Sequence, residues 1–116
     1  MELTGKAKEQ FEEWYLERYF KKLIPLSMQE KFAILDSFDE IYNAMKWGVY
    51  QDFADSVGVM IELQVHAEPT MQGTVFNKFK VSILNNGSFI SVFRGFITRP
   101  EARTECVDRL DELLNK

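Results

Sequence analysis

Apolar residues recur at helical spacing in the first half of the chain and at every second position in much of the second half. The first segment, residues 5–24, has a wide apolar stripe with glutamates between its members, which predicts a helix covered over a broad face. Thr4 is expected to be its N-cap, and Pro25 is expected to stop it. The stripe consists of Phe11, Trp14, Tyr15, Leu16, Tyr19, Phe20, Leu23 and Ile24.

A capping-box pattern, Ser27-Met28-Gln29-Glu30, predicts that a second helix begins near residue 28. Helical spacing then continues to Val57, and one helix of that length would span about 45 Å. Because a domain of this size has a radius of gyration near ~13 Å, we expect a break. We place it at Asn43, which would cap a third helix, and the alternative position is Trp47-Gly48.

The period changes to two after Gly58, a residue type that suits the position following a helix. Three strands are expected, at Val59–Ala67, Val75–Ile83 and Ser88–Ile97, and the turn Asn85-Asn86-Gly87 predicts a hairpin between the last two. The strands should form an antiparallel meander.

A second capping box, Thr98-Arg99-Pro100-Glu101, predicts a last helix with Ala102 and Cys106 on its apolar stripe. The predicted class is α+β, with N-terminal helices, a three-stranded antiparallel meander and a C-terminal helix. Residues 1–116 would form one domain, with a helical extension at 1–42 and an αβββα core at 43–116.

The two faces of the predicted sheet differ in chemistry. One face would carry aromatic and basic residues, which is how several RNA-binding folds stack bases and neutralise phosphates. The alternative, which we favour, is that the aromatic N-terminal helix covers this face. The core face would hold Ile61, Phe79, Val81, Ile90 and Val92, and the other face Phe76, Lys78, Lys80, Phe89, Ser91 and Phe93.

Composition narrows the class of protein. One cysteine and one histidine in 116 residues exclude an intramolecular disulfide and leave no Cys/His cluster for zinc. No apolar run approaches the ~18 residues of a membrane span, and the start MELTGKAKEQ lacks a signal-peptide core. We therefore expect a soluble protein of a reducing compartment with no membrane partner.

The net charge of −4 is confined to the first half of the chain. Residues 1–58 carry 7 basic and 11 acidic side chains, whereas residues 59–116 carry 7 of each. The stretch 69–100 has basic residues and no acid, so a local basic strip could act on phosphates within a Debye length.

The reactive residue types favour packing or surface roles. Cys106 falls on an apolar helix stripe, and His66 ends a strand without a neighbouring nucleophile. Carboxylates at helical spacing could hold a cation or serve as an acid–base pair, but acidic solvent faces have the same pattern. We therefore expect no enzyme activity, no cofactor and no metal. These carboxylates are Asp36, Asp39 and Glu40, and Asp52 with Asp55.

The order of elements from Asn43 onward resembles that of a double-stranded-RNA-binding domain. The segment Thr98-Arg99-Pro100-Glu101-Ala102-Arg103 is similar to the Ser-Lys-Lys-Glu-Ala-Lys start of that family's last helix. The resemblance implies that Arg99 and Arg103 contact phosphates. Pro100 replaces the central lysine, and His66-Ala67-Glu68-Pro69-Thr70 lacks the family's Gly-Pro-x-His order.

A second resemblance is to small uncharacterised proteins of Bacteroidetes phages and prophages. It is carried by Trp47-Gly48-Val49-Tyr50-Gln51-Asp52-Phe53 with Asp55-Ser56-Val57-Gly58, and by the block at residues 98–103. This resemblance implies a bacterial host cytoplasm and carries no known activity.

Two functions from different classes follow as expectations. The first is a non-enzymatic phage or prophage accessory protein that binds another protein or a second copy of itself. The alternative is binding of double-stranded RNA or DNA, whose affinity would fall steeply with salt. The residues expected to bind nucleic acid are Lys78, Lys80, Arg94, Arg99 and Arg103.

Overall fold

In the computed structural model, the described part of the chain is an α+β fold, so the predicted class is confirmed. The structure describes residues 1–20, 25–69, 71, 73, 75–86, 88–96 and 98–116, and gives the backbone alone at 66–69, 75–77, 88–94 and 96. The elements are α1 (Gly5–Phe20), α2 (Met28–Glu40), α3 (Asn43–Ser56), β1 (Val59–Pro69), β2 (Val75–Asn85), β3 (Ser88–Phe96) and α4 (Arg99–Leu114).

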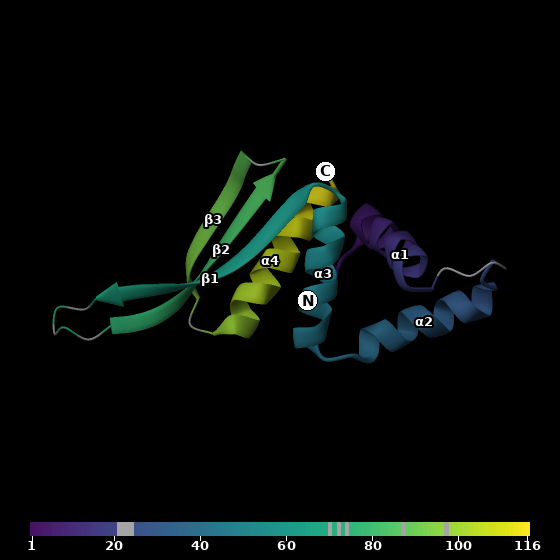
Figure 1. The fold of residues 1–116 in the computed structure, drawn as a ribbon, viewed down its shortest axis with the longest axis horizontal. Helices are drawn as coiled ribbons and strands as arrows, with labels where there is room; N and C mark the ends of the chain where they lie inside the picture. The colour runs from purple at the N-terminus through teal and green to yellow at the C-terminus, as the bar shows by residue number, and fades with distance from the viewer. Residues whose placement is uncertain (21–24, 70, 72, 74, 87, 97) are drawn as a thin grey trace.

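The strands form an antiparallel sheet of order β1-β2-β3. Helices α3 and α4 pack on one of its faces (Figure 1). That face holds Val59, Ile61, Val81 and Ile83, each at most 3% exposed. Burial of these β-branched side chains against the two helices forms the core of the molecule.

The opposite face of the sheet is not covered by α1, so the expectation of helix coverage is wrong. Helix α1 packs against the other helices instead, because its Phe11 ring finds aromatic partners on α2 and α3. On the uncovered face, Met60 is 46% exposed and Gln64 is also exposed.

The register also corrects the expected division of residues between the two faces. Phe93 is paired with Val81, and Ser91 with Ile83, so these two β3 positions belong to the helix-covered side. The irregular register between Phe79 and Val81, and beyond Ile83, breaks the simple alternation from which the expectation came.

The break between α2 and α3 falls at the expected place, but its capping differs from the prediction. Ser27 and Glu30 form the expected reciprocal capping box at the start of α2. Tyr42 rather than Asn43 is the N-cap of α3, and it makes no side-chain capping bond. The extended backbone of Ile41 and Tyr42 therefore ends one helix and begins the next without an Asn cap.

The start of α1 is held by the far end of the chain. The Thr4 carbonyl accepts the first helical bond, from Lys8, but the Thr4 hydroxyl donates to Asp111 at 2.8 Å instead of capping the helix. The Ala7 N–H donates to the side chain of Asn115 at 3.1 Å. Thr4 thus precedes α1 as expected, but its side chain does not make the expected N-cap hydrogen bond to the helix. The expected helix end at residues 21–24 lies outside the described residues.

The molecule is elongated, with extents of 63 × 29 × 22 Å and a Cα radius of gyration of 16.8 Å. A compact domain of this length would have a radius near ~13 Å. Figure 1 shows why: the β1–β2 hairpin extends from one end, and α2 extends from the other. Both elements therefore leave much of their length outside the core.

Candidate functional site

The predicted basic residues do not form one strip. Lys78 and Lys80 flank Phe79 on β2, so they lie on the face opposite to that ring. The Arg99 guanidinium lies 5.5 Å from the centroid of the Phe79 ring, on the helix-covered side. The sheet therefore separates Arg99 from the two lysines, and the side chain of Arg94 lies outside the described part.

Arg103 lies one helical turn after Arg99 on α4, so the structure keeps these two arginines together. Arg103 is half-buried, and its Nε is a buried nitrogen with no hydrogen-bond partner among the described residues. The pair is thus a small cationic site at the start of α4, smaller than the five-residue strip that we expected.

The reactive groups have structural surroundings. Cys106 is fully buried, and burial raises the pKa of its thiol to about 12, so the thiol stays protonated at neutral pH. The side chain of His66 lies outside the described part. Among the described residues, no group of three His, Cys, Asp or Glu is placed to hold a metal ion.

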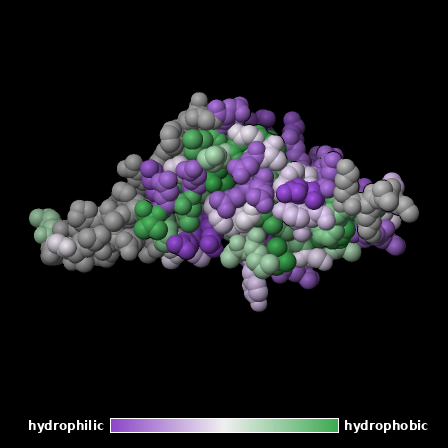
Figure 2. Space-filling model, in the orientation of Figure 1, coloured by the Kyte–Doolittle hydropathy of each residue, from purple (hydrophilic) through white to green (hydrophobic). Residues whose placement is uncertain are grey.

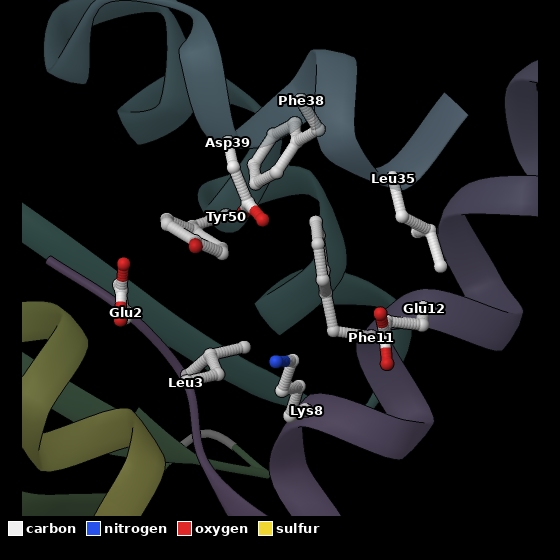
Figure 3. A pocket seen from close by; sticks show the side chains of 9 residues that line it. All are labelled: Glu2, Leu3, Lys8, Phe11, Glu12, Leu35, Phe38, Asp39 and Tyr50. Carbon is white, nitrogen blue, oxygen red and sulfur yellow. The ribbon is translucent and has the colours of Figure 1, made fainter. Parts of the chain in front are cut away.

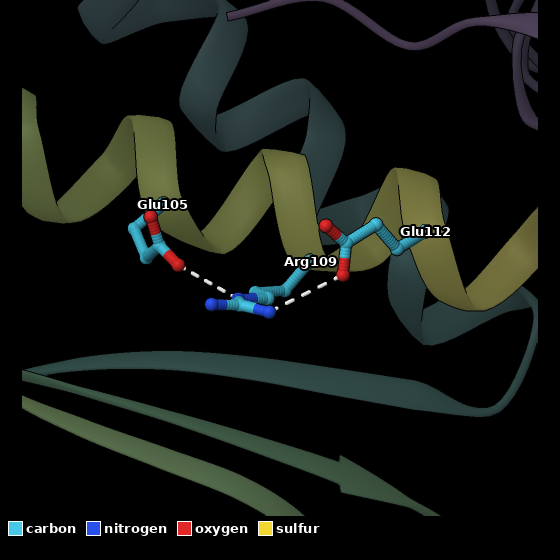
Figure 4. Close-up of polar contacts among 3 residues, drawn as sticks. All are labelled: Glu105, Arg109 and Glu112. Carbon is cyan, nitrogen blue, oxygen red and sulfur yellow. Dashed lines mark hydrogen bonds and ion pairs between the residues drawn. The ribbon is translucent and has the colours of Figure 1, made fainter.

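Arg109 forms ion pairs with two glutamates of α4 (Figure 4). Its guanidinium donates to Glu105 at 2.7 Å and to Glu112 at 3.3 Å. The hydrogen bond to Glu105, above all, raises the pKa of Arg109. Partly exposed pairs along one helix add little to stability, so we assign this cluster no functional role.

The most distinctive surface is on α2. Met28 is 64% exposed and Phe32 is 59% exposed, and with the half-buried Leu35 they follow one side of the helix. We call Met28, Phe32 and Leu35 the α2 stripe. In Figure 2, hydrophobic side chains lie along the lower edge of the molecule, over α2 and the start of α3. Exposed Tyr42 and Met45 extend the apolar surface onto α3.

Sequence reasoning did not single out the α2 stripe. The helical spacing of Phe32, Leu35 and Phe38 was visible, but spacing cannot tell which apolar residues a helix buries. In the structure, Phe38 is 3% exposed and packs on Phe11, whereas Phe32 is 59% exposed.

A cavity of about 60 Å³ lies where the N-terminal segment, α1, α2 and α3 meet (Figure 3). This volume has room for a few water-sized groups. Its lining includes the rings of Phe11, Phe38 and Tyr50, and Leu35 and Asp39 from α2. The remaining lining residues are Glu2, Leu3, Lys8 and Glu12.

The electrostatic character of this pocket is negative. Glu2, Glu12 and Asp39 contribute three carboxylates, against one ammonium from Lys8. Burial raises the pKa of Tyr50, and the negative charges of Asp39 and Glu2 raise it further. The pocket therefore disfavours a second anion and favours a cation.

No family model, no curated protein and no solved structure matches this chain. Among the helices of the described residues, none is both long enough and apolar enough to cross a membrane. The α2 stripe and its neighbouring pocket are therefore interpreted from their own chemistry.

Proposed function

We propose that this chain is a non-enzymatic accessory protein of a phage or prophage that works by binding another protein through the α2 stripe. The observation that carries the proposal is the exposure of Met28 and Phe32 on one side of a helix that extends from the core. Contiguous exposed apolar side chains with a polar border mark interaction sites. The phage or prophage origin rests on the two sequence blocks at residues 47–58 and 98–103.

Charge supports a protein partner over a nucleic acid at this surface. Residues 25–42 carry four carboxylates and one lysine, so the border of the α2 stripe repels phosphates. The same charge attracts a basic partner. A helix with an apolar side flanked by lysine or arginine matches both properties of the surface.

Photo-crosslinking in the native host cell tests this proposal. A photoreactive p-benzoylphenylalanine replaces Phe32, and the control replaces Met60, which is exposed on the uncovered sheet face. We expect a single adduct with another protein from position 32 and none from position 60. Equal adducts from both positions, none from either, or an adduct of twice the chain mass would contradict the proposal.

A further inference from the structure

The pocket lies at one end of the α2 stripe. Asp39 follows Leu35 by four residues and Phe32 by seven, so these side chains lie on the same side of α2. Leu35 and Asp39 both line the pocket. A helical partner that covers Met28 and Phe32 therefore reaches the pocket with the next turn of its own helix.

Three walls of the pocket are aromatic rings, and one of these rings carries a hydroxyl group. The rings of Phe11, Phe38 and Tyr50 lie with centroids 5.0 to 5.6 Å apart. Tyr50 is 3% exposed, and its hydroxyl has no hydrogen bond among the described residues. The Tyr50 side chain is thus almost wholly buried, and its hydroxyl oxygen can accept a hydrogen bond from a ligand in the pocket.

Two carboxylates of the pocket, those of Glu2 and Asp39, lie near this hydroxyl. Figure 3 shows Tyr50 between Glu2 and Asp39, with the Asp39 carboxylate directed toward the space between Tyr50 and Phe11. A donor with positive charge would meet a carboxylate, a hydroxyl oxygen and ring faces together. Carboxylates and aromatic ring faces both attract a cationic side chain.

The chain already buries a cation beside this wall. The ammonium of Lys46, a residue 6% exposed, donates to the Asp39 carbonyl at 2.9 Å and lies 5.6 Å from the centroid of the Phe38 ring. Lys8 also lines the pocket, but no described ion pair joins it to a lining carboxylate. Because Lys8 is exposed, its side chain can move into solvent at little cost.

We propose that the pocket binds a lysine or arginine side chain of the protein that docks on the α2 stripe. This inference rests on the proposed function and adds the chemistry of the partner. The cation lies against Phe11 and Phe38 and donates to Asp39 and Tyr50. The partner is then a segment with apolar residues followed by one basic side chain that anchors it.

The probe for this site is n-butylammonium, which carries the end of a lysine side chain and requires no identified partner. Amide chemical shifts of the full-length ¹⁵N-labelled chain are followed during titration at constant ionic strength. We expect saturable shifts among residues 2–12 and 35–50, and no saturable shift with n-butanol. Non-saturating shifts, or equal shifts with n-butanol, would overturn the inference.

Matched variants identify the binding group. Asp39→Asn should weaken binding about tenfold or more, because a hydrogen bond to a charged group is lost. Asp36→Asn removes the same charge from an exposed position outside the pocket and should leave binding unchanged. Lys8→Met removes the competing ammonium and should strengthen binding. If Asp36→Asn and Asp39→Asn weakened binding equally, the cation would be held by the general negative charge of the surface and not by the pocket. That result would overturn the inference.

The two proposals fail in different experiments. If n-butylammonium does not bind while position 32 still crosslinks one protein, the pocket inference is wrong and the docking surface stands. If the pocket binds the cation but position 32 gives no adduct, the proposed function is wrong at the α2 stripe.

Discussion

Phe11 connects the helical half of the molecule at the residue scale. It is 4% exposed and lies on α1, and its ring centroid is within 6.0 Å of five other aromatic rings. Those rings belong to Trp14, Tyr15, Phe38, Tyr50 and Phe53. One side chain therefore holds α1, α2 and α3 together.

Truncation of this ring should be costly. Phe11→Ala should lower the free energy of unfolding by about 3–5 kcal/mol, because it leaves a cavity among the rings. Phe32→Ala, the same change at an exposed position, should alter it by less than about 0.5 kcal/mol. Urea unfolding followed by circular dichroism measures both. A large loss for Phe32→Ala would show that the α2 stripe is not free.

The buried thiol of Cys106 should make stability depend on pH. Its pKa is raised from 9.0 to about 12 in the folded chain, chiefly by burial. The unfolded chain loses this proton above pH 9.0 while the folded chain keeps it. The contribution of the Cys106 thiol to the free energy of unfolding is therefore complete below pH 9.0. It falls by about 1.4 kcal/mol per pH unit as the pH rises toward the pKa of the folded chain. The free energy of unfolding, measured with urea between pH 9 and 11, should decline less steeply for Cys106→Ala than for the unchanged chain. Equal slopes for the two proteins would contradict this prediction.

At the scale of elements, α1 depends on the end of α4. The Asn115 side chain accepts from Ala7 N–H and donates to the Thr4 carbonyl, so it supplies the cap that Thr4 does not. Asn115→Ala should cost about 1–2 kcal/mol in urea unfolding. Glu112→Ala, which breaks an exposed pair on the same helix, should cost less than about 0.5 kcal/mol. Equal costs would refute this role of Asn115.

The start of α2 and the strand periods could be predicted because their signals are local. Ser27 and Glu30 lie three residues apart and bond each other, and alternation marks the strands. The cap from Asn115 and the packing of α1 could not be predicted, because their partners lie far away in sequence. Tyr42 rather than Asn43 is the N-cap of α3, because its extended backbone lets its carbonyl accept the first helical bonds, from Met45 and Lys46, without a capping side chain.

At the scale of the whole molecule, the candidate site could be predicted only in part. The sequence contained the apolar residues of α2 and the cations of β2 and α4, but not their surroundings. Whether Phe32 is covered depends on where α1 lies, and whether Lys80 and Arg99 share a surface depends on which side of the sheet each occupies. Both answers come from tertiary packing, which periodicity does not specify.

Separation of the cations predicts weak nucleic-acid binding. Fluorescence anisotropy of labelled double-stranded RNA and DNA should stay flat up to about 100 µM protein at physiological salt, in the range of the weakest non-specific binding. This prediction would be contradicted by salt-sensitive binding at lower protein concentrations, if a variant carrying both Arg99→Glu and Arg103→Glu bound more weakly. The alternative function would then replace the proposed one.

The central claim is that the α2 stripe binds a partner protein. Calorimetric titration of the purified crosslinked partner into the chain and into its Phe32→Ser variant tests this claim most directly. We expect Phe32→Ser to weaken binding by about tenfold to a hundredfold, because an apolar contact of roughly 1.5–3 kcal/mol is lost. The control Met60→Ser should bind like the unchanged chain. Equal affinities of the unchanged chain and Phe32→Ser would contradict the account.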